Sequence, residues 1–229
     1  MLVVTKGWME VDAYWVEKGI AVCLLLLIIW LFIKPTILNT SLLVLFLVVF
    51  AVIVYENAGK PNVGLSFLTS SAKWILPILY LLVYKKIHEV EFHFPKWLFP
   101  MLKVSLFVIF FVHGLSCFLM HPVFIDYIIG LSEFFTNNYI KQSTAETILI
   151  IIGIIDVAIA FLILIKPLKW VLIWMIIWGF LTSFLRIVDG SIFNYTEFLI
   201  RMPHFIIPLV YLMLLQQKHL QNNSLAGVN

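Results

Sequence analysis

Seven long apolar segments follow one another along the chain, and each is ended by charged residues, a proline or a polar cluster. They cover residues 19–33, 37–55, 65–84, 101–121, 146–165, 168–187 and 200–216. About 20 consecutive apolar residues are enough for a helix to cross a bilayer, and a helix satisfies its own backbone polar groups there. The pattern therefore predicts an all-α fold, a polytopic transmembrane helical bundle of about seven helices.

A less apolar segment separates the fourth and fifth of these predicted helices. Residues 122–141 mix isoleucine, phenylalanine and tyrosine with Asp126 and Glu133, so the segment is too polar to span a membrane. This mixture is typical of an amphipathic helix that lies in the membrane surface. We expect it to cover the outer mouth of the bundle as a lid.

The third and seventh apolar segments resemble each other. Pro77 and Tyr80 in the third recur as Pro208 and Tyr211 in the seventh at one constant offset, and a Lys-Pro pair follows both the first and the fifth segment. This spacing indicates an ancient duplication. Because the equivalent helices lie four passes apart, the two copies run the same way through the membrane, as a parallel repeat.

The duplication predicts the domain organisation. We expect a three-helix N-terminal part over residues 1–99 and a four-helix C-terminal part over residues 100–217, which includes the amphipathic segment. A polar cytoplasmic tail follows at residues 218–229.

Composition strengthens the membrane interpretation. Of the 229 residues, 63% are hydrophobic and only 12% are charged, whereas about a quarter are charged in soluble domains. The spans leave no room for a soluble domain of typical size, so any chemistry has to lie in the bundle or its short loops. No basic run suggests nucleic-acid binding, and the lipid bilayer is the expected partner, together with other membrane-protein subunits.

The distribution of charge predicts the orientation. With the N-terminus outside, the inner loops and tail hold eight lysines: Lys34, Lys85, Lys86, Lys96, Lys103, Lys166, Lys169 and Lys218. Most of the acidic residues lie on the outer side in this orientation. Because cytoplasmic loops carry the excess of basic residues, this favours an N-terminus outside and a C-terminus in the cytoplasm.

Ionisable residues within the spans are the candidates for function, because each is costly in lipid unless it faces a partner or water. Five of them fall in the outer half of the predicted bundle: His113, Asp156, Arg186, Arg201 and His204. One interpretation is a polar pocket that binds a polar or anionic headgroup and passes protons. The alternative is structural: Asp156 pairs with an arginine and the histidines hydrogen-bond between helices.

A metal site is a weaker possibility. His113, Cys117 and His121 recur every four residues and so share one face of a helix, which is a spacing that can hold a transition metal. His121, however, lies beside Pro122 at the expected membrane surface, and no carboxylate completes the set. We therefore predict no metal, and the ligand set disfavours haem as well.

Short motifs in the second half resemble the DoxX-like family of small four-helix membrane proteins. The residues concerned are Val112 to Leu115, Gly153 to Asp156, Arg186, and Arg201 to Pro208, and the likeness covers about residues 102–215. The chain departs from the family pattern in having Asp156 for a commoner glutamate, Lys103 for an arginine, and Ser116-Cys117 for a Gly-His pair.

The resemblance implies a bacterial inner-membrane protein with redox or sulfur-linked physiology, since relatives include the small subunit of a thiosulfate:quinone oxidoreductase. It also implies that the five candidate residues line the family pocket. Our leading hypothesis is a subunit of a redox or quinone-linked system, with quinone as the candidate cofactor. The alternatives are a non-catalytic accessory or scaffold subunit of a larger complex and, third, a small-solute transporter.

Overall fold

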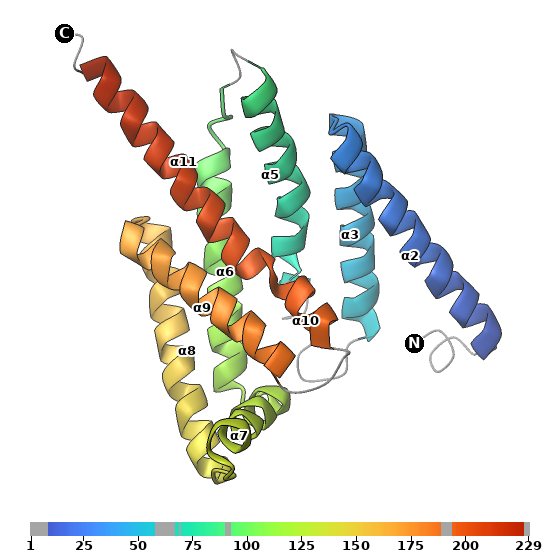
Figure 1. The fold of residues 1–229 in the computed structure, drawn as a ribbon, viewed down its shortest axis with the longest axis vertical. Coiled ribbons are helices and arrows are strands. Elements are labelled where there is room, and N and C mark those ends of the chain that lie inside the picture. The colour runs from blue at the N-terminus through green and yellow to red at the C-terminus, as the bar shows by residue number, and fades with distance from the viewer. Residues whose placement is uncertain (1–8, 58–66, 69, 90–92, 189–193, 227–229) are drawn as a thin grey trace. The chain divides into compact units, whose positions relative to one another are not determined.

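The computed structural model describes residues 9–57, 67–68, 70–89, 93–188 and 194–226, and within these residues it is built from helices alone (Figure 1). The helices are α2 (Glu10–Ile33), α3 (Ile37–Asn57), α5 (Ser71–His88), α6 (Leu98–Phe118), α7 (Pro122–Thr136), α8 (Gln142–Ile165), α9 (Lys169–Val188), α10 (Asn194–Arg201) and α11 (Pro203–Ala226). The all-α prediction is confirmed for the described part of the chain.

Five stretches of helix among the described residues are long and apolar enough to cross a membrane, which indicates a multi-pass membrane protein. They are Tyr14–Ile33, Leu98–Phe118, Gln142–Ile165, Lys169–Ile187 and Phe198–Gln217.

Two of the seven predicted spans, those in α3 and α5, are not among these five stretches. The described apolar part of α3, Ile37–Ile53, is shorter than the other spans. Helix α5 carries Lys73, Lys85 and Lys86 within its 18 residues, which lowers its apolar character. The number seven and the internal repeat therefore stay predictions. Residues 65, 66 and 69 of the predicted third segment lie outside the described residues.

The chain divides into two compact units, residues 1–94 and residues 95–229. In the first unit, α2 packs on α3 and α3 packs on α5. The turn between α2 and α3 is held by the buried Asn39, whose amide donates to the carbonyl oxygen of Lys34 at 2.7 Å and accepts from the backbone N–H of Thr36 at 2.8 Å. A Lys-Pro pair thus ends one helix, as predicted, and one asparagine satisfies the freed backbone groups.

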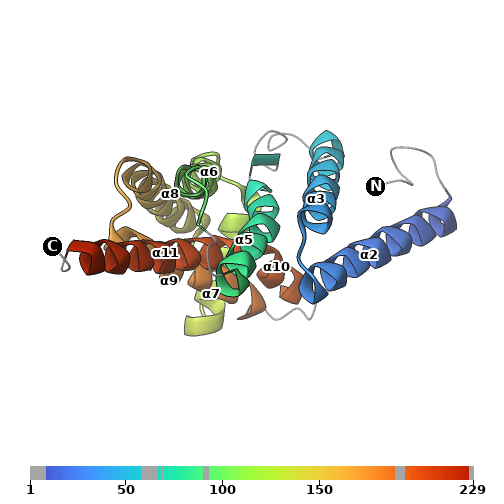
Figure 2. The ribbon, with the colours of Figure 1, turned by 90° about the horizontal axis from the view of Figure 1, so that it is seen from above.

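In the second unit, α6 packs on α8, and α9 packs on both α10 and α11. Figures 1 and 2 show α9 and α11 side by side, with α7 lying across the end of the unit where α6 ends and α8 begins. Helix α7 lies in the segment predicted to be amphipathic. Its Ile125 is buried against Cys117, Ala145 and Leu149, so α7 is attached to α6 and α8 through an apolar cluster.

Glycines lie at two close helix contacts in this unit, between α6 and α8 and between α9 and α11. A Cβ atom at Gly114 of α6 would lie 2.8 Å from the carbonyl oxygen of Gly153 and 2.8 Å from Val157 Cγ2 on α8. A Cβ atom at Gly179 of α9 would lie 2.8 Å from the carbonyl oxygen of His204 at the start of α11. Small residues let the backbones of membrane helices approach closely. The functional residues of these helices are consequently brought within reach of one another.

We expect Gly114→Ala to lower the free energy of unfolding by about 1–3 kcal/mol, because the added methyl group would push α6 and α8 apart. The matched control is Gly19→Ala in α2, where no atom lies within 4 Å of the new Cβ. There the greater helix propensity of alanine should leave stability unchanged or raise it by up to about 1 kcal/mol. The free energies of unfolding can be measured in detergent micelles, with circular dichroism as the signal. Equal changes in the two variants would contradict a close contact of α6 and α8 at Gly114.

One predicted helix end was wrong. The fourth segment was expected to run to His121, but α6 ends at Phe118, because Met120 takes a left-handed conformation (φ 50°) and Pro122 begins α7. The last predicted span, residues 200–216, agrees with the apolar stretch Phe198–Gln217. Helix α11 continues beyond this stretch to Ala226, so much of the predicted polar tail is helical.

Candidate functional site

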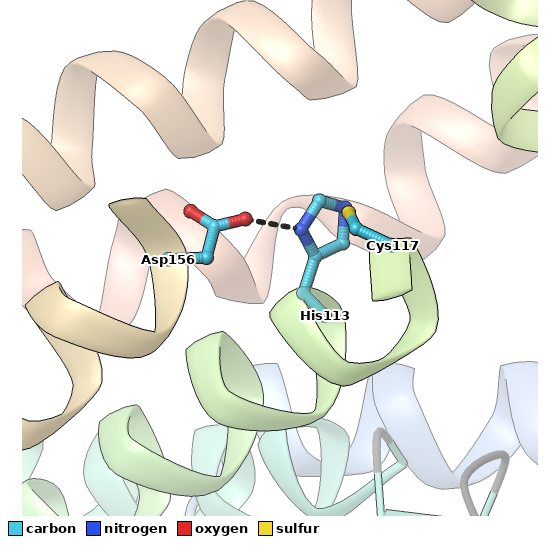
Figure 3. A group of neighbouring side chains, drawn as sticks. All are labelled: His113, Cys117 and Asp156. Carbon is cyan, nitrogen blue, oxygen red and sulfur yellow. Dashed lines mark hydrogen bonds and ion pairs between the residues drawn. The ribbon is translucent and has the colours of Figure 1, made fainter. Parts of the chain in front are cut away.

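The centre of the candidate site is a hydrogen-bonded pair that joins α6 to α8. His113 Nδ1 donates to Asp156 Oδ2 at 2.6 Å (Figure 3). Asp156 is completely buried, and its second oxygen, Oδ1, has no hydrogen-bond partner within the described part of the chain. With Nδ1 as the donor, the neutral imidazole keeps the lone pair of Nε2 available to another group.

Cys117 completes a trio with this pair. It lies one helical turn after His113 on α6, and its sulfur, a nitrogen of His113 and a carboxylate oxygen of Asp156 all lie within 4.8 Å of one another. Figure 3 shows the three side chains gathered between the two helices. The absence of a side chain at Gly153 makes this possible, because a Cβ atom there would lie 3.1 Å from Cys117 Cβ.

A cavity of about 110 Å³ opens next to the trio. Both His113 and Cys117 line it, and most of its remaining wall is apolar, with Phe124 and Ile128 from α7 and Leu149 from α8. A mainly apolar hollow with a few convergent polar groups is the usual form of a small-molecule site.

Two cations and an indole also line the cavity. Arg186 of α9 donates from Nη1 to the hydroxyl oxygen of Tyr127 at 3.3 Å, and its guanidinium lies 4.5 Å from the centre of that ring. Arg201, at the end of α10, also lines the cavity. The side chain of Trp178 lines the cavity, and its buried indole nitrogen has no hydrogen-bond partner among the described residues. The arginines offer donors to an oxygen-bearing or anionic group, and the indole N–H could do so after a rotation of its side chain.

His204 lies at a second, much smaller hollow of about 10 Å³, close to the space of a single water molecule. This hollow shares four lining residues with the main cavity: His113, Trp178, Thr182 and Arg201. His204 Nδ1 donates to the carbonyl oxygen of Arg201 at 3.0 Å. Of the five residues predicted to form one pocket, His113, Arg186 and Arg201 therefore line the main cavity, Asp156 lies behind His113, and His204 lines the adjoining hollow.

The set of weak metal-ligand candidates on α6, for which no metal was predicted, differs from the set that the structure brings together. His121 was expected to share a helix face with His113 and Cys117, and no carboxylate was expected. Because α6 ends at Phe118, His121 leaves that face and instead stacks on Phe124 with ring centres 5.0 Å apart. Asp156 takes its place in the trio.

We expect protonation of His121 to destabilise the fold. Burial lowers the pKa of His121 below its ordinary value, and the charges of Arg201 and Arg186 lower it further. As the pH falls below the unfolded-state pKa, near 6.5, the unfolded chain binds this proton first, so stability present at higher pH is lost. The unfolding midpoint should therefore fall more steeply from about pH 7 to about pH 5 in the wild type than in His121→Gln. If the unfolding midpoint falls equally steeply with pH in both proteins, another titrating group causes the loss of stability.

Among the cavity residues that sequence reasoning passed over are Trp178 and Thr182, which carry polar groups. Both line the cavity, and both were passed over as ordinary members of an apolar span. The spacing of residues in the sequence could have indicated both. Trp178, Thr182 and Arg186 are spaced four residues apart, so they share the face of α9 on which the arginine was already a candidate.

Comparison of the chain with protein-family models, with curated proteins and with solved structures finds no match. The likeness to DoxX-like proteins rests on the short motifs alone.

Proposed function

We propose that this protein is an integral membrane subunit of a redox or quinone-linked system and that the cavity of its second unit binds a quinone head group. The observation that supports this is a set of polar groups at one mainly apolar cavity. They are the imidazole of His113, which is hydrogen-bonded to Asp156, and the side chains of Arg186, Arg201 and Trp178.

The size of the cavity fits a small ring better than a large ligand. A cavity of about 150 Å³ admits benzene, and pockets for drug-sized molecules begin near 300 Å³. At about 110 Å³ the hollow can receive much of one ring after small side-chain adjustments. The apolar wall of α7 suits the ring, and the unsatisfied indole donor suits a carbonyl oxygen at its edge.

The residues at the cavity suit the exchange between quinol and quinone. Oxidation of a quinol to the quinone releases two electrons and two protons. The Nε2 lone pair of His113, whose Nδ1 is bonded to Asp156, would accept one proton, and water would take the other. The arginines would stabilise negative charge that develops on the ring. The proposal assigns the electrons to another subunit of the membrane system.

The predicted membrane and orientation of the protein are part of the proposal. The resemblance to DoxX-like proteins supports a bacterial inner membrane, and the lysine distribution supports an N-terminus outside and a cytoplasmic C-terminus. In that orientation the cavity lies in the outer half of the bilayer, with α7 at the outer surface.

Binding of a short-tailed benzoquinone to the purified full chain, measured by equilibrium dialysis, tests the proposal. We expect about one quinone per chain and a roughly fivefold weaker affinity for Trp178→Phe, which loses one hydrogen-bond donor. The matched control is Trp174→Phe. Trp174 stacks on Trp178 from one turn away, is 40% exposed and does not line the cavity, so its replacement should leave affinity unchanged.

Other results would favour other functions. Binding of a short-chain anionic phospholipid in place of the quinone would assign the cavity to a lipid headgroup. If neither ligand binds and the native protein co-purifies with further subunits, the accessory-subunit hypothesis is favoured. Binding of a small solute that responds to Trp178→Phe would favour the transporter.

A further inference from the structure

We propose that His113, Cys117 and Asp156 form a binding site for a divalent transition-metal ion. The three residues offer an imidazole nitrogen, a thiol sulfur and a carboxylate oxygen, and these donor atoms lie within 4.8 Å of one another. Figure 3 shows them converging from two helices, with His113 and Cys117 on α6 and Asp156 on α8. The site goes beyond the proposed quinone function and does not depend on it.

The geometry is close to what a metal needs. Zinc binds sulfur at about 2.3 Å and nitrogen or oxygen at about 2.0–2.2 Å, so two ligands of a tetrahedral site lie roughly 3.3–3.6 Å apart. Donor atoms no more than 4.8 Å apart reach those separations through small side-chain rotations. The backbones are already held close, because Gly114 and Gly153 face each other across the same contact.

The burial and incomplete hydrogen bonding of Asp156 are a second, independent indication of a ligand. The side chain is completely buried, yet Oδ1 has no hydrogen-bond partner. A buried carboxylate oxygen without a partner is costly, and nearly all such groups in folded proteins are satisfied. A cation bound beside His113 and Cys117 would satisfy this oxygen.

The donor set selects the class of metal. A nitrogen, a sulfur and an oxygen suit borderline-soft ions such as zinc or cobalt, whereas calcium and magnesium require oxygen ligands. One thiolate and one carboxylate would neutralise a divalent ion, which suits an apolar surrounding.

Three protein ligands leave a fourth position open, as in catalytic zinc sites. Because both His113 and Cys117 line the main cavity, an open position at the metal would face it. The bound ion would replace the proton that His113 and Asp156 share, since metal ligands must be deprotonated.

Titration of the purified full chain with cobalt chloride tests the site by absorption spectroscopy. We expect one cobalt ion per chain, with visible bands of tetrahedral cobalt and a thiolate-to-cobalt charge-transfer band. Cys117→Ser should remove the charge-transfer band, and Asp156→Asn should weaken binding by at least about 100-fold. The matched controls are Cys23→Ser, which changes the other cysteine of the chain, and His121→Gln; both should keep the wild-type spectrum.

A second measurement leaves all three ligands intact, so it does not depend on the folding of a ligand variant. In a Cys23→Ser background, zinc chloride should raise the unfolding midpoint of the protein, whereas magnesium chloride at the same concentration should not, because magnesium requires oxygen ligands. The proposal is overturned if folded wild type shows no cobalt bands and zinc does not raise the unfolding midpoint. It is also overturned if His121→Gln removes the bands, since His121 would then be the ligand. Neither measurement uses a quinone, so failure of one proposal leaves the other intact.

Discussion

Replacing His113 by leucine is expected to lower the free energy of unfolding by about 3 kcal/mol, a large effect for one side chain on a helix. His113 supplies the hydrogen bond to Asp156 Oδ2, and Oδ1 already has no partner. The single substitution would therefore leave a fully buried carboxyl group with no partner on either oxygen. Breaking a buried pair from one side costs more than the pair itself contributes.

The double variant His113→Leu/Asp156→Leu provides the control. It removes both polar groups and fills the contact with apolar atoms, which for buried pairs is often neutral or stabilising. We expect the double variant to recover most of the stability lost in His113→Leu. Denaturant unfolding in detergent micelles, followed by circular dichroism, would measure all three proteins. Equal losses in the single and double variants would show that the two residues contribute to stability separately rather than as a pair.

The second large effect is expected from filling the cavity. Thr182 of α9 lines both hollows of the second unit, and its hydroxyl donates to the carbonyl oxygen of Trp178 at 2.9 Å. Thr182→Phe would place a phenyl ring in a space of about 110 Å³. We expect affinity for a short-tailed quinone to fall by at least about 100-fold, because the ring and the ligand compete for one volume. Stability should change little, since the substitution fills a hollow.

The chain offers a close control for this substitution. Thr147 of α8 makes the same kind of bond, donating to the carbonyl oxygen of Ser143 at 2.9 Å, but it is exposed and does not line the cavity. Thr147→Phe should therefore bind quinone as the wild type does. Equilibrium dialysis of both variants measures the difference. Full binding by a folded Thr182→Phe protein would place the ligand somewhere other than this cavity.

Much of the fold could be predicted from the apolar pattern because helix formation in lipid is a local requirement. Each segment must satisfy its own backbone hydrogen bonds, so the length of an apolar run and the proline or charge that ends it indicate the helix directly. The Lys-Pro turn after α2 and the helix α7 followed from such signals. The apolar pattern is a weaker indication of a span where lysines interrupt it. This is the case in α5, which is not among the helices apolar enough to cross a membrane.

The sequence by itself determined which residues were candidates, and the tertiary structure decided which of them meet. An ionisable residue in an apolar helix is visible in the sequence because its cost in lipid is local. The partner of His113 is not visible, because it depends on the rotation of α8 against α6, set by the contact of Gly114 with Gly153. Likewise, the four-residue spacing of His113, Cys117 and His121 no longer placed the three on one helix face, because α6 ends at Phe118. Contacts between helices arise from packing among residues far apart in the chain, and no local pattern records them.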